Sequence, residues 1–213
     1  MTPLRLLIAD DHAVVRAGLR ALLESHRGWQ VCAEASDGRE AVDKAIKLKP
    51  DILILDIGMP LLNGVEAARR IHKSLPASEI LILTMHESDE LVHQVVDAGA
   101  RGYILKDEAD RVLIAAVEAL RQHKPYFSTR VSEIAEVSDS SDPSKSSRSR
   151  ITPREREILQ LLAEGKSNKE VATLLNISVN TAEAHRANIM LKLGFHSLAD
   201  LVLYAIRNKI IQP

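Results

Sequence analysis

The chain has 213 residues, which exceeds the roughly 100 to 150 residues of a typical domain and accommodates two. Hydrophobic residues make up 46% and charged residues 27% of the chain, and the net charge is −1, which excludes global disorder and favours packed cores. No apolar run reaches the roughly 18 to 20 residues of a membrane span. Asp10 and Asp11 stand where a signal peptide would need continuous apolar residues, and the lone Cys32 excludes an internal disulfide. We therefore expect a cytoplasmic protein with no membrane partner.

Charge is distributed unevenly along the chain. Residues 1–130 contain 17 Lys/Arg against 19 Asp/Glu, residues 131–149 contain 2 against 4, and residues 150–213 contain 9 against 6. The C-terminal part is therefore the basic part. A positive excess there permits nucleic-acid binding through phosphate neutralisation without establishing it.

The first half of the chain alternates short apolar runs with longer segments of helical period. The expected strands cover residues 4–10, 29–35, 51–56, 79–84 and 101–106, and the expected helices cover residues 14–25, 39–48, 64–74, 90–99 and 111–122. Strands that are apolar throughout, such as 52–55 and 80–83, suit a parallel sheet covered by helices on both faces. The sequence therefore predicts a doubly wound, flavodoxin-like α/β fold with a five-stranded parallel sheet.

Five polar side chains stand where strands of this sheet end. They are Asp10, Asp11, Asp56, Thr84 and Lys106. One acid at a strand end is commonly a solvated cap, but ligands of open α/β sheets bind at the carboxyl ends of the strands, where all five would converge. For a phosphate ligand, Lys106 would supply a cation and Thr84 a hydroxyl hydrogen bond.

The three carboxylates among them would repel one another unless a cation joined them. Oxygen ligands with room for water and phosphate suit Mg²⁺. We predict Asp11 and Asp56 as direct ligands, Gly58 as a ligand through its backbone carbonyl, and Asp10 as a ligand through a metal-bound water. The metal would offset charge on an incoming phosphoryl group, so that a carboxylate oxygen of Asp56 attacks phosphorus and forms an acyl phosphate.

The pattern changes after the fifth predicted helix. Residues 128–149 contain the serine-rich stretch that begins EVSDSSDPSKSS and lack apolar periodicity near their end, which indicates a flexible linker. From residue 151 onward the pattern is wholly helical, and Thr152, Ser167 and Ser178 are expected N-caps. We expect one domain over residues 1–127, the linker over 128–149 and a second domain over 150–213.

The second domain contains a predicted helix-turn-helix. Its two arms cover residues 169–175 and 180–193, and a further helix covers 198–207. The second arm is expected to lie in the major groove of DNA. The predicted DNA-binding residues are Lys169, Thr181, Glu183, Ala184, His185, Arg186 and Lys192, of which Lys169, Thr181, Arg186 and Lys192 suit contacts to phosphates.

Two families account for these motifs. The segments IADDH, LDIGMPLLNG, LTMH and GYILKD resemble the markers of the CheY-like receiver domain, and ITPREREILQLLAEGKSNKEVATLLNISVNTAEAHRANIMLKL resembles a LuxR-type helix-turn-helix. Their order and spacing resemble the NarL/FixJ family of two-component response regulators across nearly the whole chain. The resemblance implies a transcriptional regulator, not an enzyme, whose Asp56 accepts a phosphoryl group from a phosphohistidine on a sensor kinase. It also implies a Mg²⁺ pocket formed by Asp10, Asp11 and Asp56.

Phosphorylation is expected to act as a population shift. The surface near the fourth and fifth strands would repack, and either the recognition helix would be released or a homodimer would form. A dimer would bind paired half-sites in double-stranded DNA. RNA polymerase is a further candidate partner.

Individual positions leave alternatives open. Tyr103 matches the switch aromatic that turns inward as Thr84 moves toward the phosphate, or its ring packs with the hydroxyl at the surface. Asp107 stands where many receivers have proline, so the backbone there is expected to differ. Glu183, where many relatives have lysine, accepts from cytosine N4 or weakens phosphate attraction. His185 contacts the DNA backbone or is a satisfied, partly buried side chain.

Other functions compete with this interpretation. Asp56 also resembles the nucleophile of haloacid dehalogenase-like phosphatases, but these need a second acid two residues on, where this chain has Gly58. A regulator that binds DNA without phosphorylation, using the receiver to dimerise, is another alternative. The helical domain is also compatible with a bare four-helix interaction module.

Overall fold

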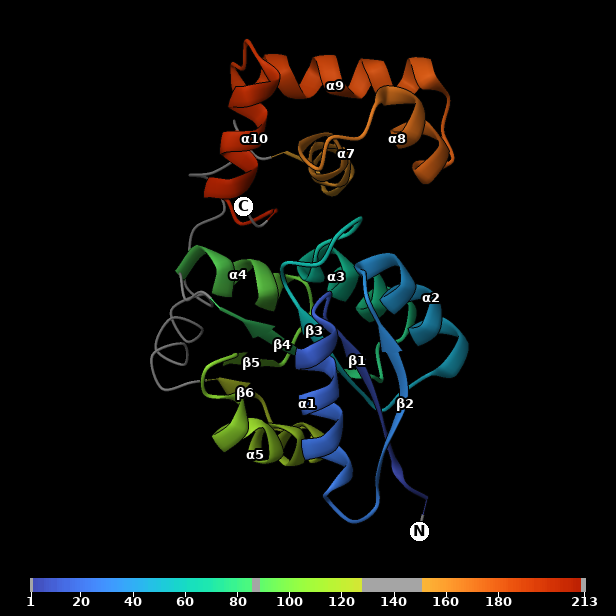
Figure 1. The fold of residues 1–213 in the computed structure, drawn as a ribbon, viewed down its shortest axis with the longest axis vertical. Coiled ribbons are helices and arrows are strands. Elements are labelled where there is room, and N and C mark those ends of the chain that lie inside the picture. The colour runs from blue at the N-terminus through green and yellow to red at the C-terminus, as the bar shows by residue number, and fades with distance from the viewer. Residues whose placement is uncertain (1, 86–88, 128–150, 212–213) are drawn as a thin grey trace. The chain divides into compact units, whose positions relative to one another are not determined.

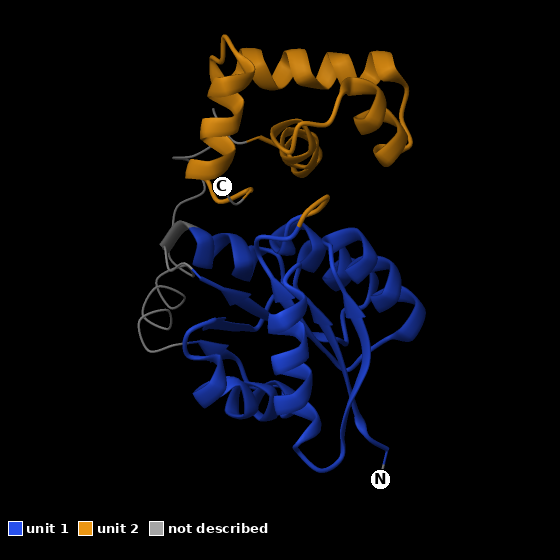
Figure 2. Cartoon of the chain, in the orientation of Figure 1, with its two compact units in different colours: residues 1–59, 63–141 blue, residues 60–62, 142–213 orange. Residues whose placement is uncertain are grey.

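The computed structural model describes residues 2–85, 89–127 and 151–211, except the side chains of residues 89 and 90. The chain divides into two compact units, one within residues 1–141 and one within residues 142–213, with residues 60–62 grouped with the second (Figure 2). The linker predicted over residues 128–149 lies outside the described residues.

A parallel sheet forms the centre of the first unit (Figure 1). Its strands are β1 (Leu4–Ala9), β2 (Trp29–Ala35), β3 (Ile52–Asp56), β4 (Glu79–Thr84), β5 (Gly102–Leu105) and β6 (Tyr126–Phe127). They lie in the order β2-β1-β3-β4-β5-β6, and every neighbouring pair is parallel. The predicted doubly wound α/β fold is therefore confirmed.

The predicted number of five strands is wrong by one, because the described chain contains β6. Its two residues pair with Gly102 and Tyr103 of β5, and the N–H of Tyr126 donates to the carbonyl of Arg101 at 2.9 Å. A two-residue strand is too short to produce a period-two pattern, so β6 could not be predicted from residue periodicity.

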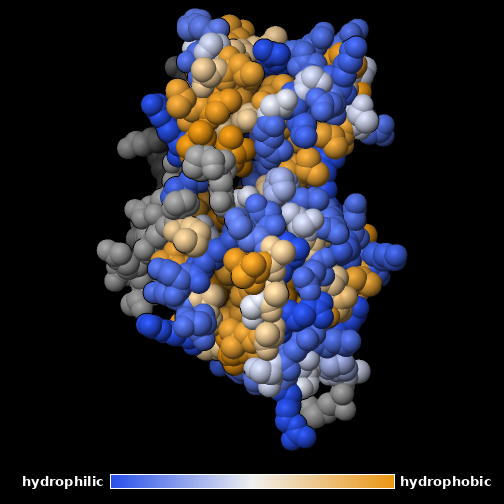
Figure 3. Space-filling model, viewed as in Figure 1, coloured by the Kyte–Doolittle hydropathy of each residue, from blue (hydrophilic) through white to orange (hydrophobic). Residues whose placement is uncertain are grey.

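Helices cover both faces of the sheet (Figure 1). They are α1 (Ala13–Glu24), α2 (Gly38–Leu48), α3 (Gly64–Ser74), α4 (Asp89–Asp97) and α5 (Ala109–Arg121). Helices α1 and α5 pack on one face through buried leucines such as Leu19, Leu23, Leu113 and Leu120. Some apolar surface stays exposed over α1 on the face seen in Figure 3. Val14, in the first turn of α1, is 86% exposed.

The central strands are buried because helices lie on both of their sides. Every residue of β3 and β4 is buried. The strands therefore read as continuous apolar runs rather than as alternating ones, and polar residues occur mainly at their ends. This arrangement places Asp56 and Thr84 at one edge of the sheet, at the carboxyl ends of β3 and β4.

The second unit is a bundle of four helices among the described residues. They are α7 (Pro153–Ala163), α8 (Asn168–Leu175), α9 (Val179–Leu193) and α10 (Leu198–Arg207). Their apolar faces meet in one core that includes Ile158, Leu161, Val171, Ile189 and Leu201, all of them fully buried.

N-caps set where these helices begin. The predicted caps Thr152, Ser167 and Ser178 each accept a backbone N–H in the first turn, and Thr152 and Ser167 complete the predicted capping boxes. Such a cap satisfies donors that the first turn leaves unpaired. No single helix of the described chain is both long and apolar enough to cross a membrane, although α9 and α10, bent by 71°, meet that test as a pair.

Candidate phosphorylation pocket and nucleic-acid interface

Three charged side chains from three strand ends meet at the carboxyl edge of the sheet. Lys106 Nζ lies 2.7 Å from Asp10 Oδ2 and 2.9 Å from Asp56 Oδ1. The two carboxylates are 1% and 2% exposed, so one lysine bridges two buried acids. The predicted convergence of these strand ends is therefore present.

The other predicted pocket residues border this group. Thr84 is buried at the end of β4, and the N–H of Lys106 donates to its carbonyl at 2.8 Å. Asp11 is exposed, with Oδ1 at 2.7 Å from Nδ1 of His12. Gly58 is partly exposed in the loop that follows β3. The pocket thus has a buried floor and an open side.

Burial governs the titration of the pocket. It raises the pKa of Asp56 above its ordinary value, and the nearby charges of Asp10 and Asp11 add to this, although Lys106 opposes it. For Lys106, burial alone would lower the pKa, but the hydrogen bonds and charges of Asp10 and Asp56 outweigh burial and raise it. Lys106 therefore stays charged.

The residues present fit a hard divalent cation. Asp10 and Asp56 share one ammonium group, and the charge of Asp11 also acts on Asp56, which leaves an excess of negative charge when all three carboxylates are ionised. Asp56 Oδ2 is buried and has no hydrogen-bond partner among the described residues. A buried carboxylate oxygen without a donor is costly unless a cation or donor reaches it, and Mg²⁺ prefers such oxygen ligands.

A close approach of α3 shapes the loop beyond Asp56. Asn63 caps α3 by accepting the N–H of Glu66 at 2.9 Å, and the N–H of Gly64 donates to the carbonyl of Ile57 at 2.9 Å. A Cβ on Gly64 would lie 2.1 Å from the backbone oxygen of Asp56. Glycine is therefore needed for the helix to begin this close to the pocket.

Tyr103 of β5 is fully buried, with 0% exposure. Its register partner is Ile82, two residues before Thr84 on the neighbouring strand. The alternative in which its hydroxyl reaches the surface is therefore excluded for this conformation. Whether the ring moves on phosphorylation remains a proposal.

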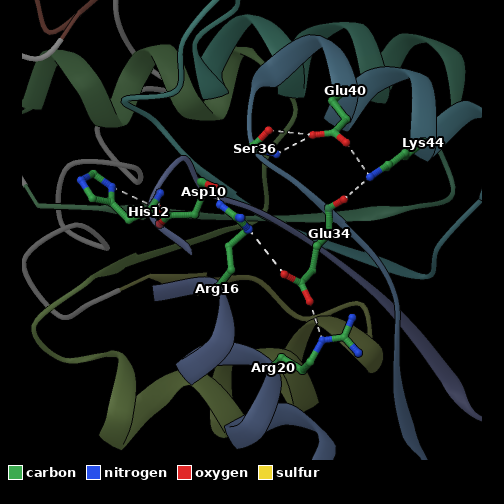
Figure 4. A network of polar contacts seen from close by, with 8 residues as sticks. All are labelled: Asp10, His12, Arg16, Arg20, Glu34, Ser36, Glu40 and Lys44. Carbon is green, nitrogen blue, oxygen red and sulfur yellow. Dashed lines mark hydrogen bonds and ion pairs between the residues drawn. The ribbon is translucent and has the colours of Figure 1, made fainter. Parts of the chain in front are cut away.

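A polar network behind Asp10 was not predicted from the sequence (Figure 4). Arg16 Nη1 donates to the backbone oxygen of Asp10 at 2.6 Å, and Arg16 Nε lies 3.4 Å from Glu34 Oε2. The spacing offered a signal, because Arg16 follows Asp11 by five residues and lies in the first turn of α1. Its contact with Asp10 is to the backbone carbonyl, however, and because every residue has such a carbonyl, residue identity does not indicate the partner.

In the second unit, α8 and α9 are joined by the short turn at residues 176–178. Asn176 ends α8 with a left-handed backbone, φ 52°, and Ser178 caps α9. Ile189 is buried, so one side of α9 packs on the core and the opposite side faces solvent. These are the two arms of a helix-turn-helix.

The predicted DNA-binding residues differ in accessibility. Lys169, Thr181, Glu183, Ala184 and Lys192 are exposed, whereas His185 and Arg186 are half-buried. Lys192 Nζ lies 2.9 Å from Oε2 of Glu155 in the first turn of α7. The exposed centre of α9 also includes Ala187, Asn188 and Leu191, the last of which is 84% exposed.

The fold and the two sites define a class of protein. A parallel sheet with strands in the order β2-β1-β3-β4-β5 and an acidic pocket at its carboxyl edge is the architecture of receiver domains, and the second unit is a helix-turn-helix domain. The described chain thus combines a signal-receiving unit with a unit of DNA-binding type.

Comparison with known proteins agrees with this class. Residues 6–118 match the family model of the response regulator receiver domain, and residues 149–205 match that of the bacterial regulatory proteins of the luxR family. The chain therefore belongs to the response regulators with a LuxR-type DNA-binding domain, which are regulators of transcription.

Relatives match over almost their whole length. The oxygen regulatory protein NreC of Staphylococcus epidermidis is 41% identical over 217 residues, covering 98% of this chain and 100% of that protein. RcsB from Salmonella enterica serovar Typhimurium, bound to the promoter rprA in the presence of the phosphomimetic BeF3−, is 29% identical, with a TM-score of 0.63 and 95% and 98% of the two chains covered. A structure of two RcsB dimers bound to two parallel DNAs is 30% identical, with a TM-score of 0.58 and the same coverage.

Proposed function

We propose that Asp56 accepts a phosphoryl group from a phosphohistidine of a sensor kinase, and that this modification controls operator binding by α9. The observation that carries the proposal is the buried Asp56 Oδ2, which has no hydrogen-bond partner among the described residues and belongs to a carboxylate whose one lysine partner neutralises only part of the pocket's charge. The RcsB structure with promoter and phosphomimetic supports the same link between the two units.

Phosphoryl transfer uses the strand-end residues in distinct roles. The bond between phosphorus and the imidazole nitrogen of the donor breaks as a bond forms between phosphorus and Asp56 Oδ2, and the electron pair returns to the imidazole. Bound Mg²⁺, held by Asp11, Asp56 and the Gly58 carbonyl with Asp10 acting through water, would offset charge on the phosphoryl oxygens.

Two neighbouring groups then recognise the modified aspartate. The ammonium of Lys106 already lies 2.9 Å from Asp56 Oδ1, so it is placed to pair with phosphoryl oxygens without a large movement. The hydroxyl of Thr84 is expected to donate to the phosphoryl group. Movement of Thr84 is coupled in this proposal to the buried ring of Tyr103, which biases the surface of β4 and β5 between two states.

The modification is proposed to persist as a signal. Haloacid dehalogenase-like phosphatases use a second acid two residues after the nucleophile to hydrolyse their acyl phosphate. Gly58 occupies that position and has no side chain to act as a general base. Slow hydrolysis suits a regulator better than an enzyme that must turn over.

For the DNA interface, we infer that α9 enters the major groove. Ala184, Ala187 and Leu191 are exposed along its centre, so base contacts by apolar groups to thymine methyls fit this face. Lys169, Thr181, His185, Arg186 and Lys192 are the proposed backbone contacts, and Glu183 is a proposed acceptor for cytosine N4. On binding DNA, Lys192 would replace its ion pair with Glu155 by an ion pair with a phosphate.

The proposed partners follow from this role. They are the sensor kinase, paired half-sites in double-stranded DNA, a second copy of the chain when phosphorylated, and RNA polymerase at the promoter. The RcsB dimers on DNA support the dimer. We propose a cytoplasmic location, because the sensor kinase must transfer its phosphoryl group in the compartment that holds the bacterial promoters.

Operator binding after phosphorylation tests this proposal. The full chain is treated with Mg²⁺ and an acyl-phosphate donor, bound sequences are selected from random double-stranded DNA, and affinity is measured by fluorescence anisotropy at fixed salt. We expect affinity of the wild type to rise about tenfold or more, in line with typical couplings of roughly 1 to 3 kcal/mol. Asp56→Asn should bind at the basal level with and without the donor.

Equal stimulation of the Asp56→Asn variant would contradict the proposal. Tight, sequence-specific binding by both proteins with no stimulation in either would instead favour a regulator that works without phosphorylation. Failure of any DNA to bind would favour the four-helix interaction module.

A further inference from the structure

The peptide of Asp10 is held at four points. Its N–H donates to the carbonyl of Ala35 at 3.1 Å, and its own carbonyl accepts from Arg16 at 2.6 Å. Its Oδ1 accepts the N–H of His12 at 2.8 Å, and its Oδ2 lies 2.7 Å from Nζ of Lys106. Of these four partners, only Arg16 reaches Asp10 from a solvent-facing helix through a side chain.

Arg16 is itself anchored by Glu34 near the end of β2 (Figure 4). The carboxylate of Glu34 is also held by Arg20, whose Nε lies 2.5 Å from Oε1. The backbone oxygen of Glu34 accepts from Lys44 Nζ at 2.5 Å. Glu34 is therefore fixed from both α1 and α2, and it presents a stable carboxylate to Arg16.

The far end of this network is firmly charged. Lys44 Nζ lies 2.6 Å from Glu40, and the N–H of Ser36 donates to Glu40 at 2.7 Å. These hydrogen bonds, led by that of Lys44, lower the pKa of Glu40 to about 2. Lys44 thus retains an ionised partner throughout the range in which proteins are usually folded.

The carbonyl that Arg16 holds belongs to the peptide linking Asp10 to Asp11. Rotation of that peptide would turn the backbone of Asp11 and redirect its carboxylate, which is exposed and contacts His12. A guanidinium offers several donors in a rigid, planar fork and can bind a carbonyl and a carboxylate together. The side chain of Arg16 is only 17% exposed, which limits its alternative positions.

We propose that Arg16 is a positioning residue for the Mg²⁺ site, because its fork fixes the Asp10–Asp11 peptide against Glu34 and so aims the Asp11 carboxylate at the cation. The inference rests on the proposed function, since it takes the pocket to be the Mg²⁺ site. Outer partners of metal ligands typically contribute 10- to 100-fold in metal affinity, roughly.

A simple charge effect predicts the opposite result. Arg16 is a cation near an acidic pocket, so removing its charge alone would strengthen Mg²⁺ binding. A positioning role predicts weaker Mg²⁺ binding in Arg16→Gln, which removes the charge, and also in Arg16→Lys, which keeps the charge but lacks the planar guanidinium. Two variants at one position therefore separate the two explanations.

The test is a titration of the isotope-labelled full chain with MgCl2, followed by amide NMR shifts, without any phosphodonor. We expect Arg16→Lys and Arg16→Gln to weaken Mg²⁺ binding by about tenfold. Arg20→Lys and Arg20→Gln are the matched controls, because Arg20 binds the same Glu34 carboxylate but makes no hydrogen bond or ion pair with Asp10 in the described part of the chain. Their Mg²⁺ affinity should stay within about twofold of the wild type.

Three results would overturn the proposal: Arg16→Lys binding Mg²⁺ like the wild type, Arg16→Gln binding it more tightly, or the Arg20 variants weakening it equally. Thermal unfolding without metal checks that each variant is folded. Should Arg16→Gln fail to fold, Arg16→Lys and Glu34→Gln carry the test, with Glu34→Gln expected to weaken binding in the same direction. Absence of Mg²⁺ binding by the wild type would count against the proposed pocket itself.

Discussion

Asp56 is an ionisable carboxylate in a buried position, and its proposed role as the phosphoacceptor explains why. A carboxylate buried to 2% exposure beside two further aspartates is poorly solvated, and burial raises its pKa. Lys106 relieves this only in part, because it is shared with Asp10. A site that is costly when empty gains most from binding a cation and from being modified.

The raised pKa of Asp56 has a consequence for stability. Since its folded pKa lies above its unfolded pKa, the folded chain binds more protons in the interval between them, and the free energy of unfolding falls as pH rises through that interval. Without divalent cations, we expect Asp56→Asn to be more stable than the wild type at neutral pH, with the difference shrinking as pH falls below the interval. Urea unfolding at several pH values measures it.

The control for this prediction is Asp107→Asn, which makes the same charge change at an exposed acid. Its free energy of unfolding should stay within about 0.5 kcal/mol of the wild type. A less stable Asp56→Asn variant at neutral pH would show that pairing with Lys106 outweighs burial.

At the scale of elements, the beginning of α3 is the tightest constraint on the pocket. We expect Gly64→Ala to lower the free energy of unfolding by roughly 1 to 3 kcal/mol, because the added Cβ would meet the backbone oxygen of Asp56 at 2.1 Å. Gly18→Ala is the matched control within α1, where a Cβ meets nothing within 4 Å. It should raise stability by about 0.5 to 1 kcal/mol.

Chemical denaturation of the two alanine variants checks this contrast. Equal stability changes at positions 64 and 18 would mean that α3 shifts away from Asp56 at little cost. In that case the loop after β3 would be more adaptable than its contacts indicate.

The elements themselves were largely predictable from the sequence. Continuous apolar runs indicated parallel strands, and parallel strands bring their carboxyl ends to one edge, so the meeting of Asp10, Asp56 and Lys106 followed from pattern alone. Capping motifs placed the beginnings of α7 and α8 because their hydrogen bonds are local in sequence. Contacts between distant residues, such as Lys192 with Glu155, leave no such local pattern.

The remaining features depend on tertiary geometry. The inward position of Tyr103 was undecided because its ring suits a core with or without an exposed hydroxyl. Arg16 was missed because its partner is a main-chain oxygen, and β6 because two residues carry no periodicity. Such details depend on how elements approach one another, which the order of residue types does not specify.

For the whole molecule, the proposed function requires that a charge added at one sheet edge changes the activity of a separate helical unit. A population shift supplies this if phosphorylation favours one of two surfaces of β4 and β5. In the proposed function, dimerisation and operator binding both follow modification of Asp56. The central claim is therefore chemical and is testable without knowing the kinase or the operator.

The most direct measurement is peptide-resolved mass spectrometry of the full chain after incubation with an acyl-phosphate donor, with and without Mg²⁺, alongside Asp56→Asn. We expect one phosphoryl group on the peptide containing Asp56, dependent on Mg²⁺ and absent from the variant. A phosphoryl group on another residue, an unchanged yield in Asp56→Asn, or no modification of the wild type by small donors and histidine kinases alike would contradict this expectation.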